Sequence, residues 1–434
     1  MSGKKTFEIL EKIFIPKNEN IEIKGYTIKY GHIVQNGEII DEVLVSYFKA
    51  PKSYTTEDMC EINSHGGNII VKKILEICLE NGAELAEAGE FTKRAFLNGR
   101  IDLLQAESVI DIINAKTEKE VKTGVKQLEG FLSQEIKKIK QEILDSLVNI
   151  EVSIDYPEYD IEEVENNNIK KMIEEVEKSL EKLEKSFDNG KIIKEGIKTA
   201  IIGRPNAGKS SLLNAILKEE RAIVTEYEGT TRDSIEEFAT INGVLLKLID
   251  TAGIRQAVDE VEKIGIDKAK KIAQDAELII YILDSSKELD KEDFEILENI
   301  KDKNLIVILN KIDLNQKIFN NNEKLLRFTK DIINISAKNK TGIDKLYEKI
   351  TEMFNLNKIN LDNEIVITNQ RHKNLIRQAK ESIKKAKEAL ELNMPVDLVS
   401  IHIKETLEKL NSITGESVSE DVINEIFSKF CLGK

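Results

Sequence analysis

The stretch Ala200-Ile201-Ile202-Gly203-Arg204-Pro205-Asn206-Ala207-Gly208-Lys209-Ser210-Ser211 decides the fold of this chain. A short apolar run ends in a glycine, a second glycine precedes Lys-Ser, and an amphipathic stretch follows. This is the G-x-x-x-x-G-K-[ST] pattern between a strand and a helix, in which backbone N–H groups surround phosphate oxygens. Lys209 would neutralise the β and γ oxygens, and the Ser210 hydroxyl suits Mg²⁺. A chance match is the alternative, but the strand–loop–helix setting favours a phosphate-binding loop.

Length and composition indicate a chain of several globular domains. Its 434 residues are enough for two or three domains, each with a core of its own. The net charge of −14 argues against general nucleic-acid binding, so any RNA contact needs a local basic face. No apolar run approaches the ~18 residues that span a membrane. Cys60, Cys78 and Cys431 show neither a disulfide scaffold nor metal-site spacing, so we expect a cytoplasmic protein.

Hydrophobic periodicity divides the chain into four segments. Residues 1–96 have a mixed α/β pattern, and residues 97–194 are almost wholly helical. Residues 195–356 alternate short β-rich runs with helices, which is typical of a mostly parallel sheet covered on both faces. Residues 357–434 are helical again. Because helix precedes and follows the α/β segment, the economical prediction is an α/β domain inserted into one discontinuous helical domain.

Three further motifs follow strand-like runs in the α/β segment. Asp250-Thr251-Ala252-Gly253 can reach Mg²⁺ through water and meet the γ-phosphate with a backbone N–H. In Asn310-Lys311-Ile312-Asp313 the last carboxylate can accept hydrogen bonds from guanine N1 and N2, which adenine cannot supply. In Ser336-Ala337-Lys338 a backbone N–H can meet the guanine carbonyl. All lie at the carboxyl ends of strands, where open α/β sheets bind ligands, and together they predict a GTPase.

The residue after the second motif departs from Ras-like GTPases, which have a water-holding glutamine there. This chain has Ile254, whose apolar side chain cannot orient water. Asn206 offers a carbonyl oxygen for a monovalent cation beside the phosphates, where an arginine finger would otherwise place charge. Glu262 is a candidate to hold the attacking water, and the alternative for it is a solvated acidic turn.

Two polar segments near the start of the chain each allow two interpretations. Residues 53–67 form a polar loop before a helix, which favours a helix cap over a site for anionic or polar ligands. His65 in this loop is more typical of a structural hydrogen-bonding residue than of a catalyst. Lys93, Arg94 and Arg100 form either a solvated face or an anion contact.

Sequence outside the α/β segment resembles one bacterial GTPase family. The phosphate loop, Gly-Thr-Thr-Arg-Asp at 229–233 and Asp-Thr-Ala-Gly-Ile-Arg at 250–255 are shared with several such GTPases. The run Gly-Glu-Phe-Thr-Lys-Arg-Ala-Phe-Leu-Asn-Gly-Arg-Ile-Asp-Leu at 89–103, the loop His65-Gly66-Gly67 and the terminal Phe-Cys-Leu-Gly-Lys at 430–434 distinguish among them. Over essentially the whole chain the sequence resembles the tRNA uridine-modification GTPases of the MnmE (TrmE) family.

The resemblance implies a fold, an activity and partners. It implies an N-terminal folate-binding domain, a discontinuous helical domain and an inserted G domain. It also implies K⁺-aided and Mg²⁺-dependent GTP hydrolysis, with the G domains of a homodimer closing on each other. The implied partner is the FAD protein MnmG, which with this chain would form a heterotetramer. The pair would install a carboxymethylaminomethyl group on carbon 5 of the wobble uridine of certain tRNAs, using a one-carbon unit from 5,10-methylene-tetrahydrofolate.

The family's site residues carry over to matching positions of this sequence. The resemblance assigns K⁺ to Asn206, Thr225, Tyr227 and Thr230, and Mg²⁺ to Ser210 and Thr231. Glu262 matches the water-orienting glutamate, and Cys431 matches a cysteine proposed to act in the modification chemistry; the alternative for Cys431 is a small apolar residue ending a helix. The resemblance also assigns the binding of folate, including its 5-formyl derivative, to Glu61, Arg100 and Lys434. The loop that contacts the nucleotide and its cations comprises Thr225, Glu226, Tyr227, Glu228, Gly229, Thr230 and Thr231.

The sequence departs from the family pattern at its start. Family members open with a β-strand and a Gly-rich loop ending in Arg-Ile-Ser-Gly, whereas this sequence begins Met1-Ser2-Gly3, so about the first two dozen residues of the pattern are expected to be missing. A folate-contacting arginine belongs to that segment, which weakens the folate prediction. The competing prediction is a ribosome-assembly GTPase, a switch without RNA-modifying chemistry, although such proteins would carry an RNA-binding module with a basic face.

Overall fold

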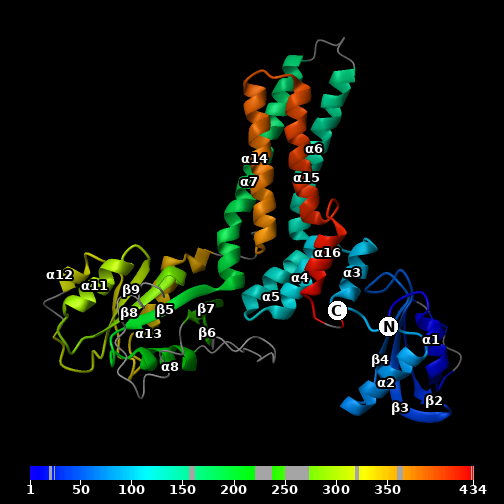
Figure 1. Ribbon diagram of the computed structural model, residues 1–434, viewed down its shortest axis with the longest axis horizontal. Coiled ribbons are helices and arrows are strands. Elements are labelled where there is room, and N and C mark those ends of the chain that lie inside the picture. Colours follow the sequence, from blue (N-terminus) through cyan, green and yellow to red (C-terminus); the bar gives the residue numbers. More distant parts are fainter. Residues whose placement is uncertain are drawn as a thin grey trace. The chain divides into compact units, whose positions relative to one another are not determined.

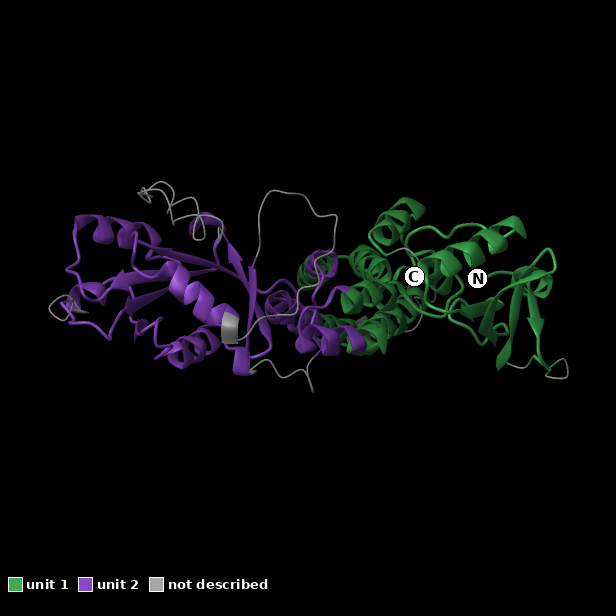
Figure 2. Ribbon diagram, turned by 90° about the horizontal axis from the view of Figure 1, so that it is seen from below, with its two compact units in different colours: residues 1–113, 126–177, 378–434 green, residues 114–125, 178–377 purple. Residues whose placement is uncertain are grey.

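The computed structural model describes residues 1–18, 22–23, 25–155, 162–219, 237–249, 273–317, 322–358, 365–431 and 433. The chain divides into two compact units, drawn in green and purple in Figure 2. Unit 1 comprises residues 1–113, 126–177 and 378–434, and unit 2 comprises residues 114–125 and 178–377. Because the second unit interrupts the first along the chain, the predicted multidomain class, an α/β domain inserted into helical sequence, is confirmed.

Unit 1 begins with an antiparallel sheet covered on one face by two helices (Figure 1). Its elements are α1 (Thr6–Ile13), β1 (Phe14–Pro16), β2 (Tyr26–Gln35), β3 (Glu38–Phe48), β4 (Met59–Asn63) and α2 (Asn68–Glu80), with strand order β1-β2-β3-β4. Leu10 of α1 and Ile77 of α2 pack on the inward residues of the sheet, such as Val45.

The segment 53–67 is therefore not wholly a loop, because β4 lies within it and pairs with β3. The prediction missed this strand since it is short, lies at the sheet edge and carries Glu61 and Asn63 on its exposed positions. The adjoining helix α2 does begin after Gly67, as expected.

The other elements that the structure describes in unit 1 are helices. Its helices are α3 (Glu90–Leu97), α4 (Leu103–Asn114), α6 (Phe131–Asp155), α15 (Val396–Thr414) and α16 (Glu420–Ser428), while α5 (Glu118–Leu128), α7 (Glu162–Glu195) and α14 (Gln370–Glu391) belong in part to unit 2. Phe427 and Phe430, at the C-terminal end of the chain, pack with Ala95 and Leu103, which follow the first sheet. Sequence segments from the two ends of the chain thus share one core.

Unit 2 is built on a six-stranded sheet of order β10-β9-β8-β5-β7-β6. The described strands are β5 (Ile197–Gly203), β6 (Glu237–Ile241), β7 (Val244–Ile249), β8 (Leu278–Asp284), β9 (Asn304–Asn310) and β10 (Ile332–Asn334). Among these six, β6 pairs antiparallel with β7 and the other pairings are parallel. Their helices are α8 (Lys209–Glu219), α11 (Lys291–Ile300), α12 (Asn322–Leu325) and α13 (Ile343–Met353), followed by the 3₁₀ turn η2 (Leu356–Lys358).

Both faces of this sheet are covered, as its continuous apolar strands require. Ile282 of β8 packs with residues of α8 and α13, such as Leu213 and Leu346. Its neighbour Tyr281 points to the other face and packs with Ile296 of α11. The parallel strands therefore bring their carboxyl ends to one edge of the sheet. Among the described residues, no helix is both long and apolar enough to cross a membrane.

Candidate functional site

The phosphate loop connects the end of β5 to the start of α8, and two of its positions admit only glycine. A Cβ on Gly203 would lie 2.5 Å from the carbonyl oxygen of Ile282 in the neighbouring strand. At Gly208 the φ angle is +106°, and a Cβ would lie 2.0 Å from the side-chain nitrogen of Asn310. Both contacts are closer than a carbon atom tolerates, so the pattern's glycines follow from packing as well as from the curvature of the loop.

Lys209 is 8% exposed, and its ammonium donates hydrogen bonds to the carbonyl oxygens of Gly203 at 2.8 Å and Arg204 at 3.1 Å. Ser210 and Ser211 lie exposed in the first turn of α8. Asn206 is also exposed, at a positive φ of 65°. A lysine, hydroxyl groups and the N-terminus of an 11-residue helix thus lie together, which is the arrangement that binds nucleotide phosphates.

Asn310 joins the phosphate loop to the segment after β10. Its side chain is buried, with the amide nitrogen donating to the Ala207 carbonyl at 2.8 Å and the amide oxygen accepting from the Ala337 N–H at 3.0 Å. Residues separated by more than a hundred positions in sequence are therefore held in register by one side chain. The three sequence motifs that the structure describes here converge on it.

Asp313 lies beside the Ser336 motif. The Ser336 hydroxyl donates to its carboxylate at 2.6 Å, and this bond together with the positive charges of Lys338 and Lys311 holds the pKa of Asp313 below its ordinary value. The carboxylate is consequently charged at neutral pH, with a second oxygen left to accept hydrogen bonds from a guanine edge.

Lys311, within the third motif, has a φ of 66° and pairs with Asp284 at the end of β8, with the two charged atoms 2.7 Å apart. Burial disfavours the Asp284 carboxylate, but the hydrogen bonds from Lys311 and Ser286 outweigh it, so its pKa is lowered. Asp284 was not singled out from the sequence. Its signal is weak, since it is one acidic residue ending an apolar run.

Several predicted site residues lie outside the described residues. They are Thr225, Glu226, Tyr227, Glu228, Gly229, Thr230, Thr231, Asp250, Thr251, Ala252, Gly253, Glu262 and Lys434, and Ile254 with them.

A second candidate site lies in unit 1, in a cavity of about 1010 Å³ that both Glu61 and Arg100 line. Its walls are otherwise largely apolar side chains from β4, α2 and α4, and Gly433 near the C-terminus also lines it. The Arg100 guanidinium donates to the Tyr54 carbonyl at 3.0 Å and stacks on the Tyr54 ring, 4.6 Å from its centroid. A cavity with an arginine, a carboxylate and a flat aromatic ring suits a polar heteroaromatic ligand.

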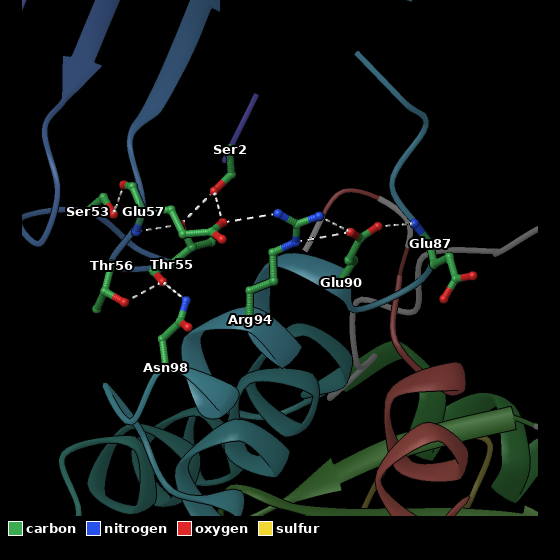
Figure 3. Close-up of polar contacts among 9 residues, drawn as sticks. All are labelled: Ser2, Ser53, Thr55, Thr56, Glu57, Glu87, Glu90, Arg94 and Asn98. Carbon is green, nitrogen blue, oxygen red and sulfur yellow. Dashed lines mark hydrogen bonds and ion pairs between the residues drawn. The ribbon is translucent and has the colours of Figure 1, made fainter. Parts of the chain in front are cut away.

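The loop that carries Tyr54 is held by a polar network (Figure 3). Arg94 of α3 lies between two carboxylates, donating to Glu57 at 3.1 Å and through Nε to Glu90 at 3.0 Å. Ser2 donates to the same Glu57 carboxylate at 2.9 Å, and Asn98 donates to the Thr55 carbonyl at 2.7 Å. Arg94 is therefore held by carboxylates of the protein itself, and its role in this network is structural.

Two other predicted residues have local roles. His65 places Nδ1 2.8 Å from the Asp41 carboxylate, while its backbone N–H donates to the same side chain at 2.9 Å, as expected of a structural histidine. The Cys431 carbonyl accepts a hydrogen bond from Gly89 at 3.3 Å, beside the tightly packed start of α3. Tyr54 was missed as a site residue because nothing in its local sequence indicates that Arg100 stacks on it.

Comparisons with known proteins agree along the whole chain. A family model described as the MnmE helical domain matches residues 103–431, and one described as the GTP-binding protein TrmE N-terminus matches residues 1–100. A tRNA modification GTPase MnmE of Acetivibrio thermocellus is 51% identical, covering 100% of this chain and 95% of the relative. The protein of that name from Clostridioides difficile is 49% identical with the same coverage. A crystal structure of the G domain of the T. maritima FeoB iron transporter is 25% identical over 36% of this chain and 98% of that chain, with a TM-score of 0.26.

Proposed function

The chain belongs to the MnmE family of tRNA modification GTPases, and from this premise we propose a specific reaction for it. It hydrolyses GTP with the aid of K⁺ and acts with the FAD protein MnmG on carbon 5 of the wobble uridine of certain tRNAs. The one-carbon unit comes from a methylene-tetrahydrofolate held in unit 1. The observation that supports the proposal is that one chain contains both a phosphate loop joined by Asn310 to the base-reading segment and a cavity in unit 1 lined by Glu61 and Arg100.

Guanine selection is assigned to Asp313, whose charged carboxylate accepts hydrogen bonds from N1 and N2 of the base. Asn310 joins the loop that binds the phosphates to the segment that meets the guanine carbonyl. Lys209 would exchange its bonds to Gly203 and Arg204 for bonds to phosphate oxygens, because a charged partner gives the stronger hydrogen bond.

The residues of the unit 1 cavity fit a folate. Glu61 can accept hydrogen bonds from a pterin ring, Arg100 can meet a carboxylate or carbonyl, and the apolar wall accommodates the aromatic part. Lys434 is the third proposed contact. The bound folate would supply the one-carbon unit, while these residues orient it and exclude water from it.

Two cations are part of the proposal. K⁺ is assigned to Asn206, Thr225, Tyr227 and Thr230, where it would supply the positive charge that an arginine finger supplies in other GTPases. Mg²⁺ is assigned to Ser210 and Thr231, and Glu262 is assigned the orientation of the attacking water. Asn206 fits its role, because it is exposed at a positive φ in the phosphate loop and its side-chain oxygen is a hard ligand.

We further propose that the chain acts as a homodimer, and a sheet surface supports this. The face of β2 and β3 opposite the helices exposes Tyr26, Ile28 and Leu44 by 69%, 63% and 47%. These three side chains lie on the same face of the sheet. Alternate residues of a strand share a face, and the register pairs Ile28 with Ser46 and Tyr30 with Leu44. An apolar face of this kind is typical of a surface that a partner covers, and a second copy is the partner that the family indicates.

Nucleoside mass spectrometry of tRNA from cells lacking this chain tests the proposed function. Wobble uridines should lose the carbon-5 group and regain it when the wild-type chain is restored. Intact modification in these cells, together with incomplete ribosomal subunits, would instead identify a ribosome-assembly switch.

A further inference from the structure

The Arg204 side chain of the phosphate loop is bound by the acidic N-terminal end of α11. Its guanidinium forms an ion pair with Asp290 and a second with Glu292 at 3.2 Å. A third carboxylate, that of Asp293, lies 3.7 Å away. The guanidinium of this loop residue is thus engaged by carboxylates of another element.

The carboxylates that hold Arg204 are themselves fixed. Asp290 caps α11, accepting from the Glu292 N–H at 3.0 Å and the Asp293 N–H at 3.3 Å. Asp293 is 2% exposed and accepts from the Tyr281 hydroxyl at 3.0 Å. Tyr281 belongs to β8, which pairs with β5, the strand that ends in the phosphate loop. The acidic end of α11 is therefore hydrogen-bonded to the same sheet that carries this loop.

The backbone of the same residue shapes the loop. The Arg204 carbonyl accepts from the Ala207 N–H at 3.2 Å and from the Lys209 ammonium at 3.1 Å. At the other end of the turn, Asn310 holds the Ala207 carbonyl. The loop is therefore fixed on both sides of Pro205 and Asn206, by a buried amide on one side and by the Arg204 ion pairs on the other.

We propose that Arg204 is a positioning residue for GTP binding, which anchors the phosphate loop to α11 through its ion pairs with Asp290 and Glu292. The proposal rests on the GTPase activity alone and is independent of folate, K⁺ and tRNA. Binding to a loop held in its binding conformation loses less entropy, so the anchor strengthens affinity. Because the guanidinium is paired with α11, it does not serve as an arginine finger, and turnover by the bound state should not depend on it.

Binding of a fluorescent GTP analogue and the split between KM and kcat test the proposal. Arg204→Ala should weaken binding about tenfold, as expected for a coupled charged network, and raise KM in parallel while kcat stays within about twofold. Arg204→Lys should recover part of the affinity, since a lysine keeps the charge but loses the second ion pair. The loss should shrink as salt is raised, because the ion pairs are partly exposed.

Asp290→Asn is the matched second variant, because asparagine keeps the helix cap while removing the charge. It should weaken binding less than Arg204→Ala does, because Glu292 still pairs with the guanidinium, and the double variant should lose no more affinity than Arg204→Ala alone. Lys301→Ala, which removes an exposed ion pair at the other end of α11, should leave the nucleotide affinity, KM and kcat unchanged. Unchanged affinity in Arg204→Ala, a lowered kcat at unchanged affinity, or additive losses in the double variant would each overturn the proposal.

Discussion

The side-chain amide of Asn310 donates a hydrogen bond to the Ala207 carbonyl at 2.8 Å, which joins the first residue of the base-reading motif to the loop that receives phosphates. The same side chain accepts from the Ala337 N–H, so three motifs depend on one buried residue. Substitutions among these motifs should therefore have separable effects. A change at Asp313 should alter the choice of base, and a change at Gly208 should alter the loop that binds the phosphates.

Asp313→Asn should weaken GTP binding and favour xanthine nucleotide, whose edge presents an acceptor where guanine presents a donor. Losing hydrogen bonds to a charged group costs about 1.5–3 kcal/mol each. Titration of the variant with both nucleotides measures the loss of GTP affinity and the gain of affinity for xanthine nucleotide. Unchanged GTP affinity would remove Asp313 from the site.

The selectivity for GTP over ATP also has a predicted pH dependence. The pKa of Asp313 is lowered, so its carboxylate is fully charged at any pH well above the ordinary pKa of an aspartate. The charge, and with it the selectivity, is lost only as the pH falls through the lowered pKa. The ratio of GTP to ATP affinity should therefore be constant from pH 8 to about 5. Taking the ratio cancels the titration of the phosphates, and a selectivity already falling between pH 7 and 5 would contradict the assignment.

Gly208→Ala should abolish nucleotide binding. The added methyl group would lie 2.0 Å from the Asn310 side chain at a φ of +106°, so either Asn310 or the loop must move. Gly66→Ala is the control, because its Cβ would meet nothing within 4 Å. Equilibrium binding of a fluorescent guanine nucleotide to both variants measures the effect, and wild-type affinity in Gly208→Ala would refute the packing argument.

Arg100→Ala should weaken binding of 5-formyl-tetrahydrofolate by about tenfold or more, since a hydrogen bond to a charged group is lost. Lys12→Ala, in which an exposed lysine of α1 is removed, should leave the affinity unchanged. Calorimetry compares the two variants with the wild type. Equal heats and affinities in all three proteins would exclude Arg100 from a folate site.

GTP turnover should be faster in K⁺ than in Na⁺, because carbonyl ligands spaced for K⁺ hold the smaller ion loosely. It should also rise with protein concentration if facing G domains complete the site. Asn206→Ala should remove the K⁺ response while leaving the affinity for a fluorescent nucleotide unchanged. Equal turnover in Na⁺ and K⁺ by the wild type would contradict the cation assignment.

The sequence predicted the strands and helices whose periodicity is strong. The short β-rich runs expected within residues 195–356 include β8 and β9, which could be predicted because each is apolar almost throughout and central in its sheet. The strands β1, β4 and β6 were not predicted, since each is short and lies at a sheet edge, where pairing rather than local pattern determines structure.

The candidate site was predictable to a similar, partial extent. The residues of the phosphate loop and of the base-reading motifs could be named, because their chemistry depends on residue type and local spacing. The contacts that hold them could not, since Asp284, Asp290 and Tyr54 reach their partners across long sequence separations. Such contacts leave no local pattern in a single sequence.

Reconstitution tests the central claim most directly. Purified chain, the FAD partner, unmodified tRNA, methylene-tetrahydrofolate, GTP and a nitrogen donor are combined in K⁺ buffer, and wobble nucleosides are measured by mass spectrometry. A carbon-5 aminomethyl or carboxymethylaminomethyl uridine should form with the wild-type chain, and should be reduced with Arg100→Ala and with Asp313→Asn. Undiminished GTP hydrolysis by the wild type with wobble uridine left unmodified would contradict the account.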